Sequence, residues 1–224
     1  MRGLTAFNLK IVSEVLGSKA YPLAMLELLG DAPLLLDLGA NIGSFSLACH
    51  ALRPDARIIA MEPDPDNFCA LKANVGSIST ELHQAALAGQ DGVLDLFLGE
   101  KDAVANSTFI GKMAPGQKRV EVRGFDARSF LEGVERRYGE IALLKSDIEG
   151  GEWHLLNVPD GALEKIPVIF IEYHSSDFLA RFLGRLLASH VIYSGVVRFT
   201  HRGEIALLRK DLVPQDQSEY EIKG

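Results

Sequence analysis

The sequence has little cysteine and no long hydrophobic run. Its two cysteines, Cys49 and Cys69, lie in segments with a helical pattern and lack C-x-x-C spacing, so we expect two unpaired, buried side chains. No stretch approaches the ~20 apolar residues of a membrane-spanning helix, and the first residues lack the apolar run of a secretory signal. These absences predict a cytoplasmic protein without a membrane partner.

Positive charge is also scarce. The chain has 23 lysine and arginine residues against 30 aspartate and glutamate residues, which gives a formal net charge of -7. Proteins that bind nucleic acids usually carry a basic face, and the basic pairs Lys118-Arg119 and Arg136-Arg137 are too short to form one. We therefore expect a small-molecule substrate and no nucleic-acid partner.

Hydrophobic residues are plentiful enough for a sizeable core. They make up 47% of the 224 residues, and this length suits one large domain better than two. We predict a helical extension over residues 1–30, a main domain over 31–212 and a polar tail over 213–224. In the extension, apolar residues recur at helical spacing, and a second short helix is expected after Pro22. These N-terminal helices could form a homodimer interface or a substrate lid.

The main domain alternates short apolar runs with helical patterns. Buried strands are expected at residues 34–38, 57–61, 141–145 and 168–172. Helices are expected at residues 45–52 and 68–75, from about Gly151, and over 178–187. This alternation predicts an α/β fold with a doubly wound, mostly parallel sheet of the Rossmann type.

Two regions of the main domain have a different pattern. Residues 82–87, 93–98 and 120–122 have the pattern of strands joined by turns, and a polar loop is expected over 99–118. Residues 191–199 and 204–208 are expected to close the sheet as an antiparallel edge pair.

The most specific local motif is the turn Asp37-Leu38-Gly39-Ala40-Asn41-Ile42-Gly43, between the first predicted strand and the first predicted helix. Glycine permits a tight turn and a close approach of ligand to backbone, and the helix beyond presents free N–H groups. A dinucleotide fingerprint needs further glycines where this chain has Asn41 and Ser44, so a pyrophosphate would be crowded. The motif therefore favours a phosphate-free nucleoside ligand, with an NAD-dependent oxidoreductase as the alternative.

An acidic residue follows the second predicted strand. Glu62 lies where doubly wound folds place a carboxylate that accepts hydrogen bonds from ribose hydroxyls. The alternative is that Glu62 only caps the helix that begins after Pro63. A ribose acceptor is common to dehydrogenases and methyltransferases, so this residue alone does not decide between them.

Several blocks together resemble one known family. They are Leu36-Asp37-Leu38-Gly39-Ala40-Asn41-Ile42-Gly43, Glu62-Pro63 with Asn67, Leu71 and Asn74, Phe125-Asp126, Leu144-Lys145-Ser146-Asp147-Ile148-Glu149-Gly150-Gly151-Glu152, and Ile171-Glu172-Tyr173-His174. From about Leu34 to His174 the chain is similar to FkbM-type methyltransferases. The first block alone is generic for class I methyltransferases, and the later blocks make the match specific. Ser146 departs from the family pattern, which usually has an apolar residue there.

The resemblance implies a Rossmann-like fold, S-adenosylmethionine as methyl donor, and a hydroxyl acceptor on a sugar, polyketide or related metabolite. Asp37 is expected to hold the amino-acid part of the donor through its ammonium group or a water molecule. The predicted cofactor-binding residues are Asp37, Gly39, Ala40, Asn41, Gly43, Glu62, Pro63, Ser107 and Asp147. A non-catalytic nucleotide-binding module on the same fold stays open as a further alternative.

Four residues at two predicted strand ends are the catalytic candidates: Asp147, Glu149, Glu172 and His174. Methyl transfer is an in-line displacement, which mainly requires alignment, and an alcohol acceptor needs a base to take its proton. His174 is the preferred base, because imidazole titrates near neutrality.

Each candidate also has a structural alternative. Asp147 and Glu149 could cap the helix that follows them, and Glu152 could simply suit its first turn. Lys145 is expected to pair with an acidic neighbour, and Trp153 is expected to pack in the core rather than hold substrate. Carboxylates with a histidine can bind Mg²⁺, but the sequence has no firm ligand spacing, and we predict no metal.

Overall fold

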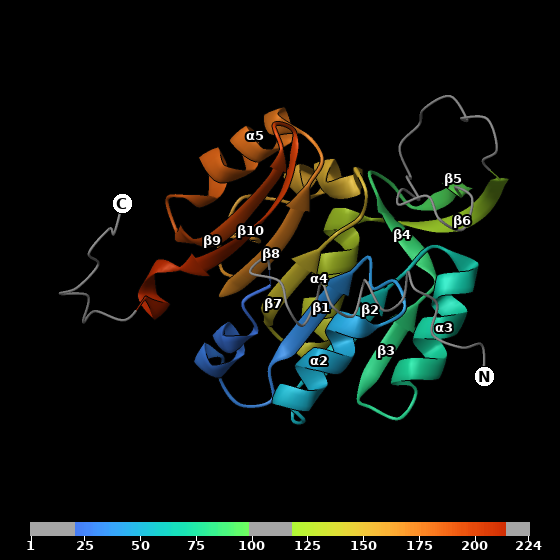
Figure 1. Ribbon diagram of the computed structural model, residues 1–224, viewed down its shortest axis with the longest axis horizontal. Helices are drawn as coiled ribbons and strands as arrows, with labels where there is room; N and C mark the ends of the chain where they lie inside the picture. The colour runs from blue at the N-terminus through green and yellow to red at the C-terminus, as the bar shows by residue number, and fades with distance from the viewer. Residues whose placement is uncertain (1–20, 99–117, 214–224) are drawn as a thin grey trace.

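The computed structural model describes residues 21–98 and 118–213, which form two β-sheets with helices packed against them (Figure 1). The larger sheet has seven strands in the order β3-β2-β1-β7-β8-β10-β9, and the smaller has three in the order β4-β6-β5. The predicted loop over 99–118, the first 20 residues and most of the polar tail lie outside the described residues.

Five neighbouring strands of the large sheet are parallel, as the strand–helix alternation predicts. The strands, in spatial order, are β3 (Thr80–His83), β2 (Arg57–Met61), β1 (Leu34–Leu38), β7 (Ile141–Ser146), β8 (Val168–Tyr173), β10 (Arg202–Arg209) and β9 (His190–Phe199). Strand β10 runs antiparallel to both β8 and β9. The predicted antiparallel pair at the edge is therefore confirmed.

Helices cover both faces of the large sheet. They are η1 (Leu23–Leu28), α2 (Ser44–Leu52), α3 (Pro65–Val75), α4 (Ala127–Tyr138), η2 (Gly151–Asn157), α5 (Ser176–Leu186) and η3 (Lys210–Leu212). Residues of η1 and α2 pack with one face of the central strands, and residues of α4, η2 and α5 pack with the other. Strands β1 and β8 are buried along their whole length because both faces are covered.

The helix ends follow local side-chain chemistry. The Asp64 carboxylate accepts hydrogen bonds from the backbone N–H groups of Asp66 and Asn67 at the start of α3. Asp126 and Ser175 cap α4 and α5 in the same way. The apolar stripe of α5 is buried through Phe178, Phe182 and Leu186, which agrees with the helix expected there.

The expected single strand over 82–87 is wrong, because the chain changes sheets within it. Strand β3 ends at His83 and pairs with β2. Strand β4 (Ala85–Ala88) then joins the small sheet, where it pairs with β6 (Lys118–Asp126). Strand β5 (Gly92–Leu98) completes that sheet and runs antiparallel to β6. Strand β3 is polar and half-buried, whereas β4 is apolar and buried.

Two smaller expectations also need correction. Cys49 is buried as expected, but Cys69 lies on the exposed side of α3. The segment from Gly151 is a 3-10 helix rather than an α-helix.

Tyr21, Met25 and Leu26, within the predicted extension, pack into the same core as α2. Within the described residues, the helices are too short or too polar to cross a bilayer.

Candidate active site

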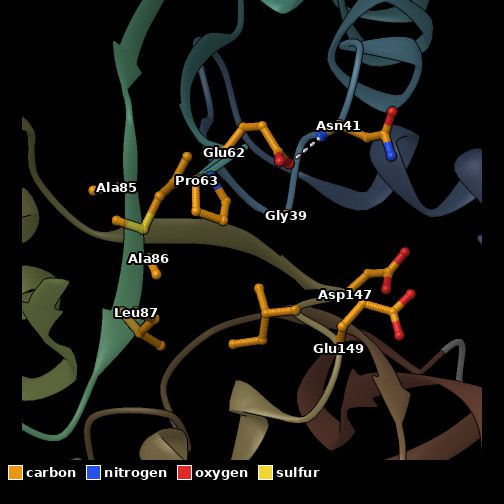
Figure 2. A pocket seen from close by; sticks show the side chains of 11 residues that line it. Gly39, Asn41, Glu62, Pro63, Ala85, Ala86, Leu87, Asp147 and Glu149 are labelled. Atoms are coloured by element: carbon orange, nitrogen blue, oxygen red, sulfur yellow. Dashed lines mark hydrogen bonds between the residues drawn. The ribbon is translucent and has the colours of Figure 1, made fainter. Parts of the chain in front are cut away.

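A pocket opens beyond the carboxyl ends of β1, β2 and β7. Its lining residues are Gly39, Asn41, Met61, Glu62, Pro63, Ala85, Ala86, Leu87, Asp147, Ile148 and Glu149. Figure 2 shows Glu62 and Asn41 on one side, with Asp147 and Glu149 on the other. This is the place where open parallel sheets bind their ligands.

Gly39 is required by the chain itself, rather than by a ligand. Its φ is +75°, and a Cβ atom there would lie 1.7 Å from the backbone oxygen of Asp147. The Asp147 N–H in turn donates a hydrogen bond of 3.0 Å to the Leu38 carbonyl. The glycine thus lets the segment after β7 cross directly over the β1 turn. Gly39 also lines the pocket, and its contact with a cofactor stays a prediction.

Two predicted cofactor residues of the turn lie behind the pocket wall. Gly43 has φ +90°, and a Cβ there would meet side-chain atoms of Leu71 and Val75 at 2.9 Å. Ala40 is buried and packs in the same small cluster, with Ala60. Neither residue lines the pocket. Both pack against α3 and fix how it lies against the turn, and their contact with a cofactor stays a prediction.

Glu62 is held by backbone hydrogen bonds at the rim of the pocket. One carboxylate oxygen accepts from the Asn41 N–H at 2.8 Å, and the other accepts from the Asp64 N–H at 3.0 Å. Burial raises the pKa of Glu62 to about 7, although the two backbone N–H groups act in the opposite direction. The helix cap is Asp64 and not Glu62, so the capping alternative for Glu62 is wrong.

Asp37 contacts protein groups instead of the pocket. Its side chain is fully buried, and one oxygen accepts a hydrogen bond of 2.7 Å from the Ser46 hydroxyl. The other lies 3.2 Å from the Lys145 ammonium, which also donates to the Gly39 carbonyl at 2.6 Å. Lys145 therefore pairs with an acidic neighbour, as expected. Asp37 supports the turn from beneath and is not among the residues that line the pocket, so its contact with a ligand, direct or through a water molecule, stays a prediction.

Asp147 and Glu149 follow β7 and line the far side of the pocket. Glu149 has φ +49°, a left-handed conformation that is rare for a residue with a side chain. The residue that precedes η2 is Gly150, and no side chain caps this short helix. The alternative that these two carboxylates serve as helix caps is therefore wrong.

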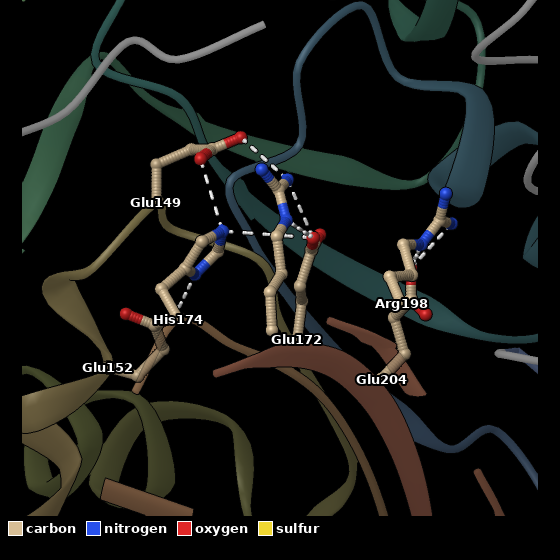
Figure 3. Close-up of polar contacts among 7 residues, drawn as sticks. Glu149, Glu152, Glu172, His174, Arg198 and Glu204 are labelled. Carbon is tan, nitrogen blue, oxygen red and sulfur yellow. Dashed lines mark hydrogen bonds and ion pairs between the residues drawn. The ribbon is translucent and has the colours of Figure 1, made fainter. Parts of the chain in front are cut away.

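The side chains of six residues meet beside this wall and are called the carboxylate cluster here: Asp147, Glu149, Glu152, Glu172, His174 and Arg202. Figure 3 labels four of them, Glu149, Glu152, Glu172 and His174. The His174 Nε2 atom lies 3.1 Å from Glu149 and 3.7 Å from Glu172. Its Nδ1 atom makes a short contact with Glu152. Residues from the ends of two parallel strands thus converge, as expected from the sequence.

Arg202, at the start of β10, joins the cluster from a third strand. Its guanidinium lies 2.7 Å from Glu172 and 3.5 Å from Glu149. Burial and the nearby Asp147 carboxylate raise the pKa of Glu172 to about 9, and Arg202 acts against this rise. Sequence reasoning missed Arg202, because nothing along the chain marks an arginine of the edge pair as a partner of distant carboxylates.

The protonation of His174 differs from the sequence-based expectation. Burial alone would lower its pKa, but hydrogen bonds to Glu149 and Glu152 outweigh this effect and raise the pKa to about 10. At neutral pH the ring is therefore mainly an imidazolium. A histidine that already carries its proton is poorly suited to take another from an acceptor, so the reason for preferring it as the base no longer holds.

Five pocket residues were not predicted: Met61, Ala85, Ala86, Leu87 and Ile148. They are apolar and lie at or just after strand ends or in β4, where a sequence pattern cannot separate a pocket wall from core.

Trp153 packs edge-on against Phe178, as expected. Ser107 lies outside the described residues. Across the described ranges, no group of three or more His, Cys, Asp or Glu side chains is arranged to hold a metal ion.

Known proteins support the fold and the family. The chain resembles the 31-O-demethyl-FK506 methyltransferase FkbM of Streptomyces tacrolimicus, with 27% identity over 70% of this chain and 71% of that protein. It resembles the 2-O-methyltransferase NoeI of Sinorhizobium fredii, with 26% identity over 65% of each, so the match spans just under two thirds of that relative. A solved structure, the precorrin-6y C5,15-methyltransferase of Geobacter metallireducens, shares the fold (TM-score 0.50, 14% identity, 93% of this chain and 92% of that one).

The model of the methyltransferase FkbM domain matches residues 37–191, which is well over half of the chain. This range runs from the first residue of the β1 turn motif to the beginning of β9. It includes the whole pocket wall and five residues of the carboxylate cluster. The chain therefore belongs to the FkbM family of methyltransferases, whose cofactor is S-adenosylmethionine.

Proposed function

We propose that the protein transfers a methyl group from S-adenosylmethionine to a hydroxyl oxygen of a small metabolite, such as a sugar or polyketide-type compound. The domain that does this is proposed to span residues 31–212. The observation that carries the proposal is the charge of the pocket wall: among the residues that the structure describes, it has three acidic side chains, Glu62, Asp147 and Glu149, and neither lysine nor arginine.

This charge pattern separates two classes of nucleotide cofactor. S-adenosylmethionine, when bound, supplies a methyl group on a positively charged sulfur. An acidic wall attracts a cation and repels the pyrophosphate of a dinucleotide. The space above Gly39 is also filled by the Asp147 carbonyl, which leaves less room for a pyrophosphate. The described wall therefore supports the methyl donor over NAD.

Glu62 is the proposed ribose acceptor. Each of its oxygens already accepts one backbone N–H, and a carboxylate oxygen has capacity for a second hydrogen bond. The backbone bonds fix the orientation of the carboxylate before a ligand arrives, which reduces the cost of binding. The apolar side chains of Met61, Leu87 and Ile148 supply a surface suited to the flat adenine ring.

Asp147 and Glu149 are proposed to face the acceptor. A carboxylate there accepts a hydrogen bond from the reacting hydroxyl, orients its oxygen and can take its proton as the new bond forms. His174 and Glu172 are not among the residues of the pocket wall, and their proposed role is to support the two carboxylates. Oxygen methylation is also what the names of both FkbM and NoeI specify for those relatives.

Isothermal titration with S-adenosylhomocysteine tests the cofactor, with NAD titrated under the same conditions as a control. We expect binding of the first compound and no binding of NAD. A screen of hydroxylated compounds with radiolabelled S-adenosylmethionine then tests the acceptor. Label transfer only to amines would contradict oxygen methylation, and binding without transfer to any class of acceptor would favour a non-catalytic module.

A further inference from the structure

His174 lies between two carboxylates that come from the segment around the start of η2. Glu149 precedes this helix and lies 3.1 Å from the Nε2 atom, while Glu152 lies within its first turn and contacts Nδ1. Glu152 is almost fully buried. The Nδ1 atom is hydrogen-bonded to Glu152, and the Glu149 carboxylate lies beside Nε2 as a charged contact, so the arrangement favours a ring that presents a proton to both carboxylates. Only the imidazolium form of histidine can do this.

Glu149 is held from two directions. One of its oxygens faces His174, and the other faces the Arg202 guanidinium at 3.5 Å. Figure 3 shows the His174 ring close to this carboxylate. His174 directly follows β8, and Arg202 is the first residue of β10. The left-handed backbone of Glu149 costs about 1–3 kcal/mol on its own, so this conformation persists only where surrounding contacts maintain it. The two cations provide such contacts.

We propose that His174 is a positioning residue, which holds the Glu149 carboxylate on the acceptor side of the pocket by pairing with both Glu149 and Glu152, and that Arg202 secures the same carboxylate from β10. This inference rests on the proposed function, because it assigns the work of the acceptor site to Glu149. His174 then acts through its fixed charge, and its proton stays on the ring during the reaction.

Acidic side chains face His174 from two of the elements packed around it, and one basic side chain lies nearby on a third. Glu149 and Glu152 face the ring from the η2 segment, and Glu172 faces it from β8 at 3.7 Å. Arg202, from β10, is the opposing positive charge, but its nearest contacts are Glu172 and Glu149. The two carboxylates of the η2 segment, Glu149 and Glu152, therefore outweigh the guanidinium, which agrees with the raised pKa of His174.

The test is an NMR titration of the histidine side chains in the full-length protein, with ring nitrogen-15 shifts as the readout. The chain has six histidines, and the signal lost in His174→Gln identifies His174. His154 and His190 serve as internal references, because burial lowers the pKa of each. We expect the His174 ring to stay doubly protonated up to about pH 9, where a free histidine has long been neutral.

A second variant keeps the inference testable if His174→Gln folds poorly. Glu149 is partly exposed, so Glu149→Gln removes one partner without leaving a fully buried charge. We expect it to lower the His174 midpoint by about one pH unit or more. The matched control is Glu132→Gln on α4, whose carboxylate pairs with Arg128 at the surface, and it should leave the midpoint unchanged.

A His174 midpoint below about pH 7 would overturn the inference, because a neutral ring cannot hold both carboxylates. An unchanged midpoint in Glu149→Gln would also overturn it, since the two groups would then not be coupled. Titration with S-adenosylhomocysteine is independent of both results. A protein that shows the expected histidine titration but does not bind this compound contradicts the proposed function and leaves the pairing of His174 intact.

Discussion

Around Glu62, a side chain is oriented by backbone N–H groups, whereas around His174 charged side chains orient one another. The Glu62 carboxylate accepts from Asn41 and Asp64 within two neighbouring turns. The carboxylate cluster instead joins groups from three strands through ion pairs. One side of the pocket thus depends on backbone geometry and the other on protonation.

This difference determines how substitutions and changes of pH should affect each side of the pocket. Backbone geometry is lost when an added atom cannot be accommodated, and a change of pH has little effect on such a clash. Ion pairs are lost when a partner is removed or neutralised, and they change continuously with pH. Variants on the two sides should therefore differ in kind as well as in size.

The largest effect is expected for Gly39→Ala. The new methyl group would lie 1.7 Å from the Asp147 carbonyl oxygen, in a backbone conformation with φ +75°. Because the overlap is with backbone, the β1 turn or the segment after β7 must move, and we expect a loss of about 3 kcal/mol or more in the free energy of unfolding. Urea denaturation measures this loss.

Gly133→Ala is the matched control for that substitution. Gly133 lies within α4, and a Cβ there meets nothing within 4 Å. Alanine is the better helix former, so we expect a gain of about 0.5–1 kcal/mol. If both variants lost stability equally, the steric explanation for Gly39 would be wrong.

The next largest effect is expected for Glu62→Ala on cofactor binding. This substitution removes the proposed ribose acceptor and leaves two backbone donors without their partner. We expect affinity for S-adenosylhomocysteine to fall about 10- to 100-fold, as for the loss of a charged hydrogen-bond acceptor. Calorimetric titration of both proteins gives the ratio.

Glu132→Ala, on the exposed face of α4, provides the control for the titration and should bind like the unchanged protein. A Glu62→Ala protein with normal affinity would remove the ribose role from this residue. Glu62 would then be only a support for Asn41 and Asp64.

A change of pH should act mainly on the carboxylate cluster. The pKa of His174 is about 10 in the folded protein against about 6.5 for an ordinary histidine. The stability from its ion pairs is therefore complete below about pH 6.5 and is lost as the pH rises through 10. The raised pKa of Glu172 gives a loss in the same direction, up to about pH 9. We expect a decrease of about 1–2 kcal/mol in unfolding free energy between about pH 7 and 9.

Urea denaturation across this pH range measures the slope, and His174→Gln should flatten it. The comparison is informative even if His174→Gln is less stable at every pH. A constant difference in the free energy of unfolding does not change how steeply that free energy falls with pH. An equally steep slope in the variant would show that the pH dependence arises elsewhere.

The two sides of the pocket also differ in how far the sequence predicts them. The β1 turn and Glu62 were found because glycine spacing and a strand-end acid are local signals. The close packing of Gly39 against Asp147 is not predictable from these signals, because Asp147 is more than a hundred residues away in the chain. The parallel sheet was predicted from alternation, but the change of sheet between His83 and Ala85 was not.

In the carboxylate cluster, the residue types were predictable and their protonation was not. The pKa of His174 depends on which groups face its two nitrogens, and this is fixed by the register of β7, β8 and β10. Arg202 was missed for the same reason. It reaches Glu172 only because β10 inserts antiparallel beside β8.

The smallest effect is expected for Arg202→Lys. Lysine keeps the positive charge but loses the fork through which the Nε and Nη2 atoms both reach Glu172 at 2.7 Å. The arginine is partly exposed, so solvent limits the contribution of the pair, and we expect a loss below about 1 kcal/mol in urea denaturation. Arg202→Met also removes the charge and should cost more. If the two variants are equally stable, charge at residue 202 does not hold the cluster, and the Glu149 carboxylate is positioned by His174 alone.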